Sequence, residues 1–102
     1  MRIIAEGTVR HWAEDHARAD SSLRQWVKVV RAAQWSSFAS LRRTFSTADL
    51  VTVGSGRKVV VFNIGGNDFR LLCAVHFNTR MVFALRFLTH AEYDKDNWKN
   101  EL

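Results

Sequence analysis

The chain has 102 residues, of which 47% are hydrophobic, and its 15 lysines and arginines against 10 acidic residues give a formal net charge of +5. A length near 100 residues fits one domain, so we expect residues 1–102 to form a single domain. The basic balance points either to a polyanionic partner such as RNA or to an ordinary basic surface, since no block of like charges occurs.

Three classes of protein do not fit the sequence. No apolar run approaches the roughly 18 residues that cross a bilayer, and the start MRIIAEGTVRHW lacks the apolar core of a signal peptide. We therefore expect a cytoplasmic protein that has no membrane partner. The single cysteine, Cys73, lies in an apolar run, which excludes an internal disulfide framework and favours a small buried side chain.

The first half of the chain predicts one strand and two to three helices. Arg2 to Ala5 is a short apolar start that suits an edge strand. Gly7 to His16 carries apolar residues at helical spacing. A further short helix is indicated after Trp35 by the spacing of three apolar residues, Phe38, Leu41 and Phe45.

The clearest helix lies between these segments. Its apolar residues recur at i, i+3, i+4 and i+7, and they are Leu23, Trp26, Val27 and Val30. Ser22 is followed three residues later by Gln25, which is a capping-box pattern. We therefore expect this helix to begin at Ser22.

From Asp49 onward the apolar pattern changes to a period of two, which is typical of strands. Leu50 to Val53 precedes a Gly54-Ser55-Gly56 turn, and Arg57 to Ile64 is a β-branched run that predicts a central strand. Gly65-Gly66-Asn67 follows directly. Because these residues tolerate positive φ, they predict a hairpin turn or bulge.

Two further strands alternate strictly. Between Phe69 and Phe77 every second residue is apolar, and Arg70 and His76 fall on the opposite face. The next strand is predicted to place Met81, Phe83, Leu85 and Phe87 on one face and Val82, Ala84, Arg86 and Leu88 on the other. If the connection at residues 78–80 places the two aromatic faces on the same side of the sheet, Arg70, His76 and Arg86 share the opposite side. We call this side the second face. We expect no slip in register, because a slip would bury the arginines.

These elements predict an α+β domain. An N-terminal strand and two to three helices should pack on one face of an antiparallel sheet of three to four strands, with the other face partly open. A short C-terminal helix is expected from about His90 to Lys99. The tryptophans are expected mostly in the core, although the position of Trp98 near the end of the chain leaves room for its exposure.

Polar side chains gather where the last strand ends. His90, Tyr93 and Asp94 stand at i, i+3 and i+4 of the C-terminal helix, so their side chains can converge. Thr89 and Glu92 form a capping-box pattern, which by itself explains those two as helix initiation.

An arginine added to this set would suit metal-free cleavage of RNA. An arginine binds phosphate and stabilises developing charge, and a histidine transfers protons near neutral pH. In such a reaction the 2′-hydroxyl attacks the adjacent phosphate, one group takes its proton, and another protonates the departing 5′-oxygen. The same residues are also compatible with simple RNA binding.

Motifs for a metal or another cofactor are absent, so we expect neither. HExxH, CxxC, GxGxxG and the phosphate-loop pattern do not occur. His11 and His16 do not share a helical face well, and Cys73 and His76 point to opposite faces of one strand.

The stretch VFNIGGNDFRLL, followed after one hairpin by LTHAEYDK, closely resembles the HigB family of bacterial toxins from type II toxin–antitoxin systems, within the RelE-like mRNA interferases. The resemblance is strong from Val59 to Lys95 and concerns only the general layout before that. It implies a RelE-like fold and a ribosome-dependent endoribonuclease that cuts translated mRNA and arrests growth. It also implies a helix-turn-helix, HigA-like antitoxin as partner, with DNA contacted only through that complex.

The resemblance also implies roles for particular residues. Arg70 matches the sheet arginine that contacts the scissile phosphate, and His90 and Tyr93 match the polar residues after the last strand. Further candidates for RNA contact are Lys58, Asn67, Arg86 and Lys95, with a structural turn role favoured for Asn67. Which residue acts as base or acid stays open. Tyr93 would need its pKa lowered from about 10 to act as a base, and stacking or positioning is an equal alternative.

Two functions without catalysis remain as alternatives. One is an RNA- or ribosome-binding module that blocks translation through the same basic face. The other is an interaction protein whose surface serves only to bind a partner. Neither would produce new mRNA ends.

Overall fold

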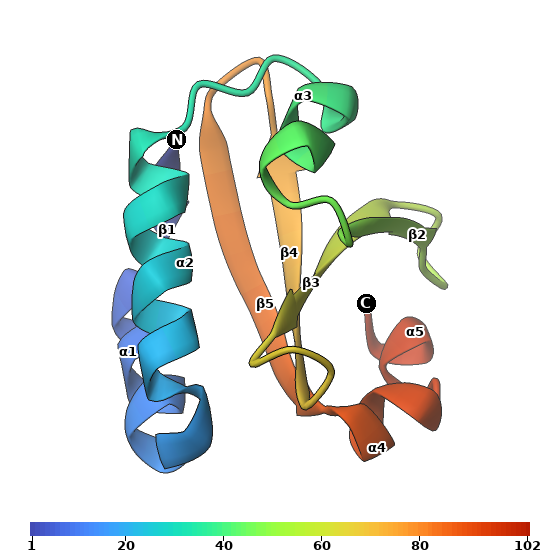
Figure 1. Ribbon diagram of the computed structural model, residues 1–102. Coiled ribbons are helices and arrows are strands. Elements are labelled where there is room, and N and C mark those ends of the chain that lie inside the picture. Colours follow the sequence, from blue (N-terminus) through green and yellow to red (C-terminus); the bar gives the residue numbers. More distant parts are fainter.

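The computed structural model describes all 102 residues and consists of a five-stranded sheet with helices on both faces (Figure 1). The strand order is β1-β5-β4-β3-β2, and β1 is parallel to β5 while the other neighbours are antiparallel. The strands are β1 (Arg2–Ile4), β2 (Asp49–Thr52), β3 (Lys58–Ile64), β4 (Phe69–His76) and β5 (Met81–Thr89). The predicted α+β layout is confirmed, and the N-terminal strand extends the antiparallel meander at one edge.

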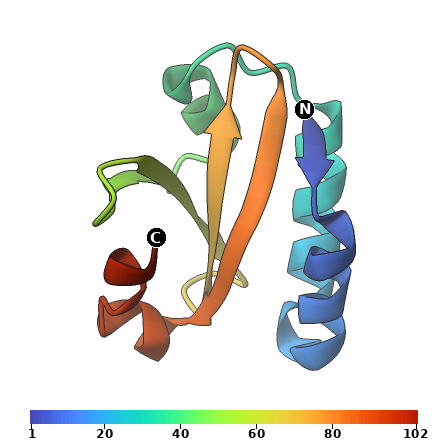
Figure 2. The ribbon, with the colours of Figure 1, turned by 180° about the vertical axis from the view of Figure 1, so that it is seen from behind.

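The N-terminal helices lie on one face of this sheet, as Figure 2 shows from behind. They are α1 (Glu6–Asp15), a short 3-10 helix η1 (Ala17–Ala19), α2 (Asp20–Ala32) and α3 (Phe38–Thr44). All three helices predicted for this half are confirmed. None of the helices in the chain has the length and apolar character needed to cross a membrane.

The predicted start of α2 at Ser22 is wrong. The helix begins at Asp20, directly after η1, so Ser22 lies inside the first turn and makes no cap. The Asp20 carboxylate favours this earlier start because it lies near the positive end of the helix dipole, and it also forms an ion pair with Arg24 at 3.0 Å. A true capping box occurs instead at α3, between Ser37 and Ser40.

The main core lies between the N-terminal helices and the sheet. It contains 16 buried residues, among them Trp26, whose ring meets that of Phe62 edge to face at 5.5 Å. Cys73 belongs to this core and is 0% exposed, which confirms its predicted burial. Burial raises the pKa of the Cys73 thiol well above its usual range, because the thiolate would lose its hydration.

The Cys73 thiol should therefore be inert in the folded protein. We expect iodoacetamide at pH 8 to leave it unmodified under native conditions and to modify it fully in denaturant, because the thiolate is the reacting form. Mass spectrometry after timed exposure measures this directly. Fast alkylation of the native protein would show that the strand opens readily.

The prediction that side chains alternate without interruption along β5 is wrong. Leu72 pairs with Arg86 but Cys73 pairs with Ala84, so a bulge leaves Leu85 as an extra residue. A bulge places one additional residue on one strand and exchanges the faces beyond it. Leu85 accordingly packs on the second face, beside Leu72.

Because of this exchange, the side chains in the first part of β5 lie on the opposite faces of the sheet from those predicted. Val82 is 0% exposed in the main core, whereas Phe83 contacts the ring of His76 at 5.1 Å on the other side. The face shared by Arg70, His76 and Arg86 is nevertheless present, since the first two alternate within β4 and the third pairs with Leu72.

The C-terminal segment also differs from the single helix that was predicted. It forms two short helices, α4 (His90–Asp94) and α5 (Trp98–Glu101), because Asp96 adopts a left-handed conformation with φ of 61°. The chain thereby turns back over the second face of the sheet. Trp98 is only 3% exposed there, so the exposure that its position near the chain end allowed does not occur, and it joins a second core with Val53, Val59, Val61 and Leu72.

Candidate active site

The turn between β3 and β4 holds Arg70 in place. Gly65 and Gly66 have φ of 64° and 70°, which confirms the predicted hairpin turn. One guanidinium nitrogen of Arg70, Nη1, donates to the carbonyl oxygens of Asn67 and Phe69, both at 3.1 Å. The turn therefore fixes the arginine through its main chain.

Arg70 is an unusual arginine because it is only 8% exposed and yet forms no ion pair within the chain. It lies on the second face, as predicted, but the Tyr93 ring limits its contact with water, with the guanidinium carbon 5.5 Å from the ring centre. Burial of an unpaired cation is costly. A guanidinium has five N–H donors, and those that the two carbonyls do not occupy remain available to an anion.

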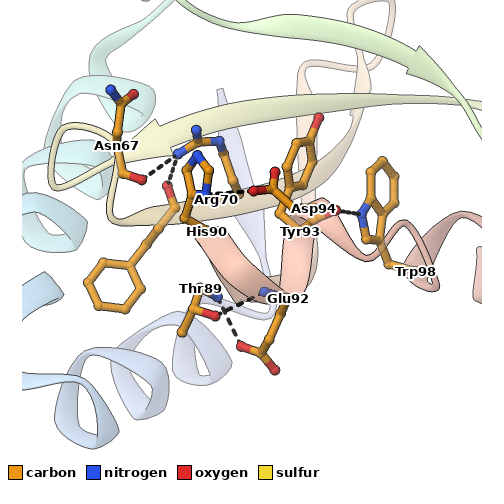
Figure 3. A network of polar contacts seen from close by, with 9 residues as sticks. Asn67, Arg70, Thr89, His90, Glu92, Tyr93, Asp94 and Trp98 are labelled. Atoms are coloured by element: carbon orange, nitrogen blue, oxygen red, sulfur yellow. Dashed lines mark hydrogen bonds and ion pairs between the residues drawn. The ribbon is translucent and has the colours of Figure 1, made fainter.

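The start of α4 is capped by its own residues, as Figure 3 shows, and is hydrogen-bonded to the same turn. Thr89 accepts a hydrogen bond from the Glu92 backbone at 3.2 Å, and the Glu92 side chain accepts one from the Thr89 backbone at 3.0 Å, which confirms the predicted capping box. The His90 backbone donates to the Asp68 carbonyl at 2.9 Å. Arg70 and His90 are therefore both supported by residues 67–69.

His90 has a carboxylate partner on its own helix. Its Nδ1 lies 2.9 Å from Oδ2 of Asp94, at the i, i+4 spacing noted in the sequence. An ionised carboxylate only accepts hydrogen bonds, so Nδ1 carries a proton and Nε2 of the neutral ring keeps its lone pair. The half-exposed pair adds little stability, but it orients the imidazole.

The Tyr93 ring stands between two other side chains. Figure 3 shows it between the Arg70 guanidinium and the Trp98 indole, and its ring stacks on Trp98 with centres 5.1 Å apart and planes 15° apart. Burial raises the pKa of the Tyr93 phenol, the negative charge of Asp49 raises it further, and the positive charge of Arg70 opposes both. The phenol is thus protonated at neutral pH and does not fit the role of a base.

This environment predicts the titration of Tyr93. It is the only tyrosine in the chain, so tyrosinate absorbance reports on it alone. We expect its midpoint above the ordinary pKa of about 10 and a lower midpoint in Asp49→Asn, where a repelling charge is removed. Since the folded protein holds this proton more tightly than the unfolded chain does, stability should fall as the pH rises past about 10. A wild-type midpoint below 10 would contradict this arrangement.

The four candidates for RNA contact lie at different distances from this cluster. Asn67 has an exposed side chain, and its carbonyl oxygen holds Arg70, in keeping with the turn role. Lys95 follows α4 directly and is exposed. Arg86 lies on the same face, where it approaches Glu101 at 3.8 Å. Lys58 begins β3 five residues before the partner of Arg70, which places it about 16 Å away along the strand.

The polar cluster does not lie in a hollow of the molecule. The three hollows in the molecule have volumes of about 350, 380 and 520 Å³, and none of them is lined by Arg70, His90 or Tyr93. No group of three or more His, Cys, Asp or Glu side chains lies close enough to hold a metal ion. A site without an enclosing pocket suits a polymer better than a small molecule.

Local sequence patterns do not reveal two residues of the cluster and one pairing within it. The stacking of Trp98 on Tyr93 is hidden, because the break at Asp96 destroys the helical spacing that would link the two residues. Asp49 raises the pKa of Tyr93 from β2, the edge strand at the other end of the sheet from β1, so no local pattern reveals this contribution. Asp94 was noted for its spacing but not as the partner of His90, and its i, i+4 position was the available signal.

The α+β layout, with a mixed five-stranded sheet and a short C-terminal helix, is consistent with a RelE-like fold. A model of the HigB_toxin family, described as a RelE-like toxic component of a toxin-antitoxin system, matches residues 19–96. The chain therefore belongs to the HigB toxin family. It is the toxin component of a toxin–antitoxin system, which implies a cognate antitoxin as its partner.

Curated relatives match nearly the whole chain at low identity. The chain is 25% identical to the mRNA interferase HigB of Escherichia coli O6:H1 over 95 residues, which is 93% of this chain and 90% of the relative. It is 26% identical to the mRNA interferase toxin HigB of Escherichia coli K12 over 94 residues, or 92% and 88% of the two chains. The mRNA interferase HigB of Shigella flexneri is similar to the same extent.

Proposed function

We propose that the protein is a ribosome-dependent, metal-independent endoribonuclease that cuts translated mRNA in the cytoplasm and so arrests growth. Residues 1–102 act as one domain, and a HigA-like helix-turn-helix antitoxin neutralises it. Any contact with DNA is made through that antitoxin complex. The names of the curated relatives support an mRNA substrate.

The buried, unpaired Arg70 is the observation that carries this proposal. A buried cation without an ion-pair partner in the chain favours binding of an anion from outside the chain. The neighbouring side chains, His90 and Tyr93, are of types that transfer protons. Donors fixed in advance toward developing charge stabilise a transition state without reorganisation. Arg70 thus binds the scissile phosphate and stabilises the charge that grows on its oxygens.

His90 and Tyr93 divide the proton transfers. Nε2 of His90 takes the proton of the 2′-hydroxyl while that oxygen attacks phosphorus. The bond from phosphorus to the 5′-oxygen breaks, and the Tyr93 phenol gives its proton to the departing oxygen. A departing alkoxide is far more basic than a phenolate, so the raised pKa of Tyr93 is compatible with this acid role. The products are a 2′,3′-cyclic phosphate and a 5′-hydroxyl.

RNA beyond the cut is held by surrounding positive charge. Lys95 and Arg86 flank the cluster and contact neighbouring phosphates, while Asn67 supports Arg70 from the turn. Lys58 reaches a more distant phosphate along β3. Such contacts depend on salt, because they release counterions from the RNA.

A translation reaction tests the proposal. The purified protein is added to translated mRNA, and to the same mRNA without ribosomes, with and without chelator, and new 5′ ends are mapped. We expect cuts only in translated message and no effect of the chelator. Arrested translation with intact message would instead favour a binding module that blocks the ribosome.

A further inference from the structure

The C-terminal helix α5 contacts the proposed catalytic cluster through Trp98. Its ring stacks on Tyr93, and its Nε1 donates to the Tyr93 carbonyl oxygen at 3.0 Å. The same carbonyl also accepts a hydrogen bond from the Asp96 backbone at 3.1 Å. Trp98 therefore contacts both the side chain and the main chain of Tyr93.

Trp98 is itself held firmly against the sheet. It is 3% exposed and packs with the buried residues of the second core on β3 and β4. The Gly54 backbone, in the turn between β2 and β3, donates to the Lys99 carbonyl at 2.7 Å. A Cβ at position 54 would lie 2.9 Å from that carbonyl oxygen, which is closer than real contacts allow, so this approach requires glycine.

We propose that Trp98 is a positioning residue, which holds the Tyr93 ring against the Arg70 guanidinium and is anchored by the contact between Gly54 and Lys99. This inference rests on the proposed function and extends it to a helix outside the region that matches the family model, residues 19–96. Without Trp98, no side chain stacks on the side of the Tyr93 ring that faces away from Arg70. The phenol oxygen then loses its fixed place beside the phosphate.

Two changes weaken this support in different ways. Trp98→Leu keeps an apolar side chain but removes the stacking and the N–H donor, and Trp98→Phe restores an aromatic ring without the donor. Gly54→Ala leaves both aromatic residues intact and displaces α5 instead. Trp35→Leu is the matched control, because Trp35 is 5% exposed, donates through Nε1 to Thr44 at 3.1 Å, and lies in the main core.

The single tyrosine gives a readout that does not depend on catalysis. In NMR spectra of protein labelled at tyrosine rings, stacking on an indole displaces the Tyr93 ring signals. Trp98→Leu should move these signals toward those of an unstacked tyrosine, Gly54→Ala should move them in the same direction, and Trp35→Leu should leave them in place. Melting curves show first that each variant is folded at the assay temperature.

Cleavage kinetics give the second readout. Loss of position in the transition state should lower kcat by about 10- to 100-fold in Trp98→Leu, with little change in KM and with partial recovery in Trp98→Phe. Trp35→Leu should retain kcat. Folded Trp98→Leu with unchanged Tyr93 signals, or with wild-type kcat, would overturn the inference. If the wild type cuts no mRNA, the proposed function fails, while the NMR comparison still decides whether Trp98 places Tyr93.

Discussion

Arg70→Met is expected to lower the rate of mRNA cleavage by about 10²- to 10³-fold and to abolish growth arrest, because it removes the cation that stabilises the transition state. Methionine keeps an unbranched apolar side chain of similar length, but it lacks the guanidinium that lies over the Tyr93 ring. End mapping in a translation reaction and growth after induction measure the two effects. Arg70→Lys should recover little activity, since an ammonium lacks the planar fork.

The same substitution should not destabilise the protein. Arg70 is buried without a carboxylate partner, and replacing such a charge by an apolar side chain relieves a desolvation cost. We expect the melting temperature of Arg70→Met to equal or exceed that of the wild type. Arg10→Ala, at an exposed arginine on α1, controls for net charge and should stay toxic. Toxicity that survives in folded Arg70→Met would refute the assigned role.

Replacing His90 by alanine should cost about 10²- to 10⁴-fold in kcat, because the base that accepts the 2′-hydroxyl proton is lost. Single-turnover cleavage of translated message measures this loss directly.

The chain supplies a matched control for His90. His11 and Asp15 form another histidine–carboxylate pair at i, i+4, on α1, with 3.3 Å between Nε2 of His11 and Oδ2 of Asp15. His11→Ala removes the same kind of group from the same kind of pair without touching the cluster. It should cleave at the wild-type rate, and an equal loss in both variants would show that the effect is not specific to His90.

Local patterns predicted most of the fold, because each element displays its own period. Alternation placed Arg70 on the second face and the glycines at Gly65 and Gly66 placed the turn before it, and both are confirmed. The start of α2 was missed because η1 runs straight into it, which makes Asp20 rather than Ser22 the first helical residue. Sequence spacing alone does not show where two helices join.

The errors that matter for function come from contacts across the sheet. The bulge at Leu85 shifts the pairing of β5 with β4 and places Leu85 on the second face, and no local residue signals it. Trp98 is buried because the chain reverses at Asp96 and returns to β3, which a helical period cannot reveal. The pKa of Tyr93 is likewise raised by burial and then by the charge of Asp49, which lies 44 positions earlier in the chain. The sequence thus predicted the polar residues but not their environment.

Attack by the 2′-hydroxyl is the central step of the proposed reaction, and a modified message tests it most directly. A ribosome is programmed with an mRNA that has a single 2′-deoxy nucleotide on the 5′ side of the mapped cut, beside the unmodified message. The proposed chemistry predicts no cleavage at the modified position, and a 5′-hydroxyl with a 2′,3′-cyclic phosphate at the cut in the unmodified message. Cleavage of the deoxy message at the same position, leaving a 5′-phosphate, would contradict it.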